Sequence, residues 1–162
     1  MTRNRLNIFG IGIACISILL AIAVYMFLRA DLPVLLEPFQ SNHKLSLANA
    51  ALSGSAPSLF YTLAIGVLLG TIAPNPAAAR FHCLGWTVIA LLLEFTQHAL
   101  FARPVIAALT NYLSDSALHI VGPYWSRGVF DPLDLLATLI GGLLALTIVS
   151  RLTTGASHVD DQ

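Results

Sequence analysis

The stretch VIALLLEF at residues 88–95 sets one acid, Glu94, among aliphatic and aromatic side chains. It lies within an apolar run over residues 81–101, which as a helix would be about 30 Å long and would span a bilayer. A charge near the centre of such a helix costs about 2.5 to 3.5 kcal/mol. We therefore predict a membrane-spanning helix in which Glu94 faces protein rather than lipid.

The composition of the whole chain supports this prediction. Of 162 residues, 57% are apolar and 10% are charged, and the mean hydropathy is +0.80. A typical soluble domain is about one quarter charged, so this composition excludes a disordered chain and argues against a water-soluble globule. Eight basic residues balance eight acidic ones, which argues against nucleic acid as a partner because no excess cations remain for a phosphate backbone. The expected partner is the lipid bilayer.

Four apolar runs are long enough to cross a bilayer. They cover residues 6–28, 57–73, 81–101 and 132–150. We predict an all-α membrane protein, a bundle of four transmembrane helices forming a single domain over residues 1–152, with a polar tail over 153–162. The thirty residues between the third and fourth runs have apolar side chains at helical spacing but are too polar to cross, which favours an amphipathic interfacial segment. The first run could be a signal peptide, but its length favours a retained anchor. Pro57 fits the first turn of the second helix.

Four crossings place both termini on the same side of the membrane. Arg3 and Arg5 directly precede the first run, and basic residues at the first helix favour a cytoplasmic N-terminus. We expect a multi-pass protein of the cell membrane with both termini in the cytoplasm.

A polar face accompanies Glu94. Gln97 and His98 follow it at i+3 and i+4, and therefore lie on the same side of a helix. In the fourth run, polar and small residues recur on one face, namely Asp131, Asp134, Thr138, Gly142 and Ala145. We expect the last two spans to pack antiparallel with these faces together, Thr138 level with Glu94, and Arg127 as the nearest cation. The predicted functional polar face is Glu94, Gln97, His98, Arg127, Asp131, Asp134 and Thr138.

Some of these residues also have a purely structural explanation. The segment Asp131-Pro132-Leu133-Asp134 is a good helix start, with Asp131 as N-cap and Asp134 in the first turn. For Glu94 the structural alternative is a hydrogen bond to Thr138 or Gln97, worth about 0.6 kcal/mol in membranes. This free energy is much smaller than the cost of placing a charge in lipid, so a functional role for Glu94 is favoured. His98 could equally be a solvated interfacial side chain.

Glycines are expected to set the helix packing. Gly66 and Gly70 form a GxxxG pattern, and Gly141 and Gly142 lie in the fourth run; such residues let helix backbones approach closely in lipid. We expect Gly66 and Gly70 to pack against a helix of the same chain rather than a second copy. Neither cysteine lies in a metal-binding motif and there is no HExxH, so no metal and no cofactor are expected, and no catalytic residue is assigned.

The second half of the chain resembles the VanZ-like family of small bacterial membrane proteins. Its pattern, E-x-x-Q, then R, then D-x-x-D-x-x-x-N-x-x-G, is matched by Glu94, Gln97, Asp131, Asp134 and Gly141. Thr138 stands where the family has Asn, and either Arg103 or Arg127 could be its Arg. The similarity extends over residues 86–145, with a longer segment between the motifs than is usual. It implies a place in the bacterial cell envelope and does not by itself imply a role in antibiotic resistance.

Three functions compete. The favoured one is non-enzymatic: the polar face binds a polar headgroup, such as a lipid-linked glycan or peptidoglycan precursor. The second is an enzyme at the membrane surface, with Glu94 or an aspartate as general base. The third is a structural subunit in which the acid pairs with an Arg of another membrane protein. Proton-coupled transport is a weaker fourth, because four spans with one acid make a thin pathway.

Overall fold

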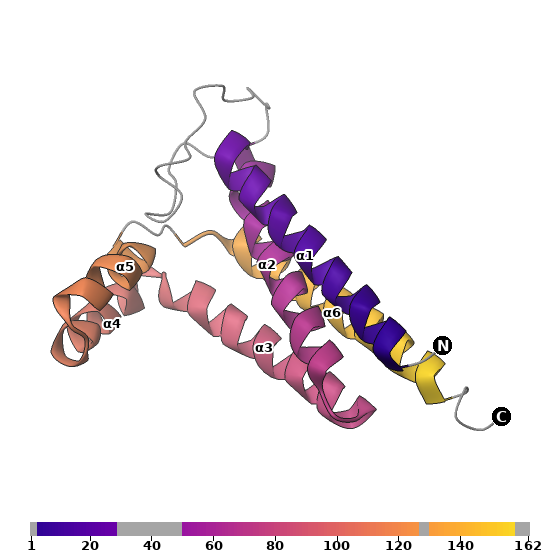
Figure 1. Cartoon of the computed structure of the whole chain (residues 1–162). Coiled ribbons are helices and arrows are strands. Elements are labelled where there is room, and N and C mark those ends of the chain that lie inside the picture. The colour runs from indigo at the N-terminus through magenta and orange to yellow at the C-terminus, as the bar shows by residue number, and fades with distance from the viewer. Residues whose placement is uncertain (1–2, 29–49, 127–129, 158–162) are drawn as a thin grey trace.

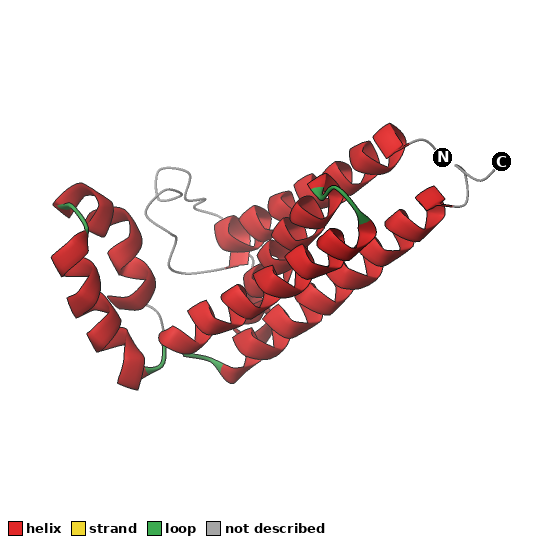
Figure 2. Ribbon diagram, turned by 90° about the horizontal axis from the view of Figure 1, so that it is seen from below, coloured by secondary structure: helices red, strands yellow, loops and turns green. Residues whose placement is uncertain are grey.

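Six helices make up the protein in the computed structural model, which describes residues 3–28, 50–126 and 130–157 (Figure 1). They are α1 (Arg3–Leu28), α2 (Ala50–Ile72), α3 (Pro76–Thr96), α4 (Ala99–Tyr112), α5 (Asp115–Ser126) and α6 (Pro132–Ser157). The described residues contain no strand, and Figure 2 shows helices and short loops only. The predicted all-α fold is confirmed.

Four of these helices are long and apolar enough to cross a membrane. The spans cover Asn7–Val24, Gly54–Ile72, Pro76–Thr96 and Pro132–Thr154. Large apolar side chains on their outer faces are exposed, for example Leu19, Val88, Leu92 and Leu143. Exposed apolar surface on this scale suits contact with lipid rather than water, so the chain is a multi-pass membrane protein.

Close approach between α2 and α6 builds the centre of the bundle. A Cβ atom added to Gly66 would lie 2.8 Å from the Cβ of Ala145, and one added to Gly70 would lie 2.6 Å from Cγ2 of Val149. The contact partner moves from Ala145 to Val149 on α6 as the glycine moves from Gly66 to Gly70 on α2. Helices α2 and α6 therefore run parallel. The GxxxG pattern therefore packs within the chain, as predicted.

Helix α6 also contacts α3 through its paired glycines. The space beside Gly141 is filled by the backbone carbonyl of Leu59 on α2, and that beside Gly142 by the side chain of Thr87 on α3. Thus α6 packs against both α2 and α3. The predicted antiparallel contact of the third and fourth spans is confirmed (Figure 1), but the polar face with Glu94 does not take part in it, because Glu94 bonds to α2.

The boundaries of the third span differ from the prediction of 81–101. Helix α3 begins five residues earlier, where the Asn75 side chain accepts a hydrogen bond from the Ala78 N–H at 2.8 Å and Pro76 takes the first helical position. It ends at Thr96, so Phe101 belongs to the next helix. The break was missed because the new helix is capped by His98, whose side chain is not a usual N-cap group.

Two other boundaries also differ. Helix α2 begins at Ala50, so Pro57 lies inside it rather than in its first turn; membrane helices tolerate this because neighbouring helices satisfy the freed backbone groups. Helix α6 continues through residues 153–157, which were predicted as a polar tail. Here Thr153 and Thr154 donate to the carbonyls of Val149 and Ser150 at 3.0 and 2.8 Å, so their hydroxyls are satisfied without leaving the helix.

The segment between the third and fourth spans is helical, as predicted, but it is two helices rather than one. Helices α4 and α5 meet at Leu113 and Ser114 and form a hairpin that runs across the bundle direction in both views (Figures 1 and 2). The turn forms because Ser114 accepts from the Ala117 N–H at 3.4 Å at the start of α5. An interfacial position for this hairpin stays a prediction.

A polar groove beside a buried acid

Glu94 lies in the last turn of α3 and only 5% of its surface is exposed. Its Oε1 accepts hydrogen bonds from the Tyr61 hydroxyl at 2.9 Å and the Ser58 hydroxyl at 3.2 Å, both on α2. The acid therefore faces protein, as predicted. Because α3 ends at Thr96, Glu94 is only about 3 Å along the axis from the helix end, and not seven residues deep as the predicted span implied.

The partners of Glu94 are a correction to the prediction, which looked to α6 and to Gln97. Ser58 and Tyr61 are three residues apart and so share a face of α2. The ring of Tyr61 meets Trp86 edge-on at 6.5 Å, which fixes the phenol against α3. The i, i+3 spacing of these two hydroxyls marks a polar face of α2 in the sequence, but nothing local pairs that face with Glu94.

Thr138 is fully buried on α6, and its hydroxyl has no hydrogen-bond partner among the described residues. The structural alternative of a hydrogen bond from Thr138 to Glu94 is therefore wrong. The contact of Gly142 with Thr87 puts Thr138, four residues earlier, level with Leu91, about one turn from the acid. Thr138 thus lies in the packed seam between the three helices.

Asp131 and Asp134, at the start of α6, have the positions that the helix-start explanation predicts. Asp131 accepts a hydrogen bond from the Leu133 N–H at 2.9 Å, as an N-cap does. Asp134 lies in the first turn of α6 and is half-buried. Arg127, the predicted cation of this face, lies outside the described residues.

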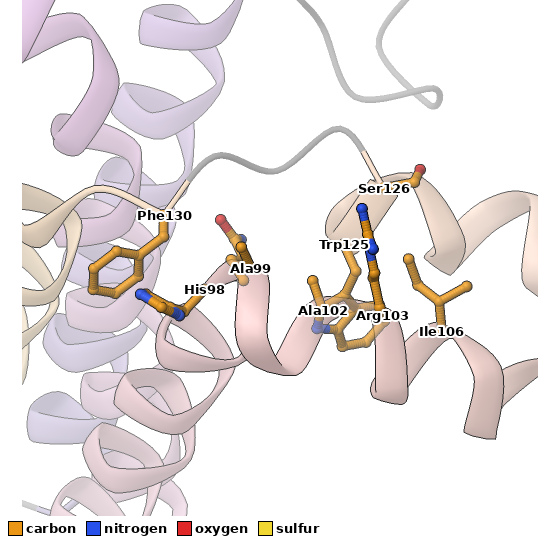
Figure 3. Close-up of a pocket in the computed structure, with 9 residues that line it drawn as sticks. His98, Ala99, Ala102, Arg103, Ile106, Trp125, Ser126 and Phe130 are labelled. Carbon is orange, nitrogen blue, oxygen red and sulfur yellow. The ribbon is translucent and has the colours of Figure 1, made fainter.

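A groove of about 630 Å³ opens at the end of α3. It is lined by Gln97, His98, Ala99, Ala102, Arg103, Ile106, Trp125, Ser126 and Phe130. Figure 3 shows His98 and Phe130 on one side and Arg103, Trp125 and Ile106 across from them. Of the predicted polar face, Gln97 and His98 line this groove. Glu94, Asp131, Asp134 and Thr138 do not.

Both walls of the groove are held by specific contacts. The Nδ1 atom of His98 accepts from the Leu100 N–H at 3.3 Å, and its ring packs edge-on against Phe130 at 5.1 Å. On the other wall, Trp125 Nε1 donates to Thr96 Oγ1 at 2.9 Å, which ties the end of α5 to the end of α3. The contact of Trp125 with Thr96 could not be predicted from the sequence, because the two residues are distant along the chain.

The chemistry that these residues offer is hydrogen bonding and positive charge. Within the described ranges, no three His, Cys, Asp or Glu side chains converge on a common point. Cys83 is buried and its thiol donates to the Gly66 carbonyl at 3.1 Å, a packing role. The groove walls are suited to hold a ligand with polar and apolar parts.

The sequence matches no protein-family model, and comparisons with curated proteins and with solved structures also find no match.

Proposed function

We propose that this protein is a VanZ-like membrane protein of the bacterial cell envelope that binds the polar headgroup of a lipid or lipid-linked precursor in the groove at the end of α3. The supporting observation is the groove itself: it combines Gln97 and His98 with the apolar side chains of Ile106, Trp125 and Phe130. Ligand sites are typically apolar clefts with a few placed polar groups.

The position of the groove matches this ligand. It begins at Gln97, directly after the last residue of the membrane-spanning helix α3. Headgroups lie at the ends of membrane-spanning helices, where the hydrocarbon ends. A bound lipid could therefore keep its chains beside the bundle while its headgroup enters between α4 and α5.

Glu94 is a positioning residue in this proposal. Its bonds to Ser58 and Tyr61 join the last turn of α3 to α2, and Gln97 is one turn further along. The acid thus fixes the helix end from which one groove wall starts.

The resemblance to the VanZ-like family fits this arrangement. Its two motif halves, Glu94 with Gln97 and Asp131 with Asp134, come from the end of α3 and the start of α6. Phe130, next to Asp131, packs on His98 at 5.1 Å, so the two halves lie at the same end of the bundle.

Lipid retention tests the proposal. Ala99 lines the groove and is exposed, whereas Ala108 is exposed on the same helix outside the groove. Ala99→Leu should fill the groove and lower the amount of lipid that stays bound after delipidation, measured by native mass spectrometry, and Ala108→Leu should match wild type. Equal lipid retention by all three proteins would refute a headgroup site in this groove.

A further inference from the structure

Resting on the proposed function, we infer that the headgroup bound in this groove carries a phosphate, recognised by Arg103 with the Gln97 amide as a further donor. Among the residues that the structure describes, the lining holds a guanidinium, an imidazole, an amide and a hydroxyl, and no acidic side chain. A ligand that enters the groove therefore meets cationic and neutral groups, and an anion gains most from them. Arginine suits phosphate because its planar fork donates two parallel hydrogen bonds.

The helix that forms the groove floor adds to this preference. Ala99 and Ala102 belong to the first turn of α4 and line the groove, and Arg103 follows. A helix N-terminus carries a partial positive charge, which favours an anion. The N–H groups of Leu100, Phe101 and Ala102 already donate to His98, so α4 contributes through this dipole, and its first turn contains no acid.

Gln97 supplies further donors in this groove. Its side-chain amide carries two N–H groups, and Gln97 lines the groove together with Arg103. His98 shapes the wall opposite Arg103: its ring points toward Phe130 (Figure 3) and packs edge-on against it, and its Nδ1 accepts the Leu100 N–H. A phosphate held by the Arg103 fork would therefore also meet the Gln97 amide.

The apolar residues of the groove favour a phosphate that is part of a lipid over free phosphate. Ile106, Trp125 and Phe130 line the same space as Arg103. A small hydrated anion gains nothing from these side chains, whereas the glycerol or first methylenes of a lipid would pack against them. The groove also opens where a membrane-spanning helix ends, so the ligand is expected from the bilayer.

Trp125 gives a direct readout. The chain has two tryptophans, and in a Trp86→Phe background Trp125 is the sole fluorophore, in the groove wall. The protein in micelles is titrated with phosphatidylglycerol or with a monoglycosyl diacylglycerol, whose polar headgroup has no phosphate, each brominated near the carbonyl end of an acyl chain, and quenching is followed. We expect at least about tenfold tighter binding of phosphatidylglycerol. Arg103→Gln should remove this preference, and Arg103→Lys should keep part of it. Arg151→Gln, an exposed arginine on α6, should change nothing.

The outcomes separate the two proposals. Equal quenching by both lipids in the parent protein would overturn phosphate recognition and leave headgroup binding standing. No quenching by either lipid would overturn the proposed function. Inorganic phosphate is titrated as a competitor: displacement only at concentrations far above those of the lipid supports a lipid ligand, whereas displacement at equal concentrations would overturn it.

Discussion

The hydrogen bond between Tyr61 and Glu94 can be measured by a double-mutant cycle in which Tyr61→Phe and Glu94→Leu are made singly and together. The bond is 2.9 Å long and its acceptor is buried. Bonds to charged groups contribute about 1.5–3 kcal/mol in soluble proteins, but double-mutant cycles in a membrane protein average about 0.6 and reach about 1.7. Because burial removes competing water, we expect a coupling free energy near the upper membrane value.

Ser58 gives an internal scale for this measurement. Its bond to the same Oε1 atom is longer, at 3.2 Å, so the cycle of Ser58→Ala with Glu94→Leu should give the smaller coupling, about 0.6 kcal/mol. Tyr112 provides the matched control, because its side chain is 87% exposed on α4. Tyr112→Phe should show no coupling to Glu94→Leu.

The free energy of unfolding is measured for each variant by reversible unfolding in mixed micelles. Distant substitutions are additive within about 0.3–0.5 kcal/mol. A Tyr61 coupling within that range would refute the contact and the register of α2 on α3 that depends on it. Glu94→Gln completes the set: its amide oxygen can still accept both hydroxyls, so it should unfold at nearly the wild-type free energy. Lipid retention by this variant then reports whether the negative charge itself supports binding.

Three further predictions concern packing, the hairpin and orientation. Gly141→Ala should lower the free energy of unfolding by about 1–3 kcal/mol, because its Cβ would meet the Leu59 carbonyl. Gly85→Ala is the control: Gly85 has open space around it, so the free energy of unfolding should change by less than about 0.5 kcal/mol. Equal effects of the two substitutions would contradict the packing of α6 on α2. Thr96→Val removes the acceptor of the Trp125 N–H and should shift the emission of a protein whose sole tryptophan is Trp125; an unchanged spectrum would argue against this tie. Orientation is tested with fusion proteins. Green fluorescent protein fused after α6 should fluoresce, which reports a cytoplasmic C-terminus, and alkaline phosphatase inserted between α4 and α5 should be active, which reports the opposite side of the membrane. The reverse pattern would refute cytoplasmic termini.

Local features were predictable from the sequence because they depend on neighbouring residues. Apolar run length indicated four crossings, since the bilayer sets how many residues a spanning helix needs. The cap at Asp131 and the close packing at Gly66 and Gly70 were predicted for similar reasons, and the structure bears them out. The break after Thr96 was also local, but His98 is an unusual cap and gave no clear signal.

The tertiary structure decided which groups meet. The sequence established that Glu94 needs a polar neighbour, but hydroxyls occur in several spans, and nothing local distinguishes Thr138 from Ser58 and Tyr61. Which hydroxyls bond to Glu94 follows from the packing of α6, which runs parallel to α2 and antiparallel to α3. In this arrangement Thr138 lies in the packed seam between the helices, and Glu94 faces α2. The groove has the same origin, because each of its walls combines residues about twenty to thirty positions apart in the chain, which meet only where α5 returns to the end of α3. The hydrophobicity of a segment determines whether it lies in lipid or in water, whereas helix packing determines which side chains contact one another.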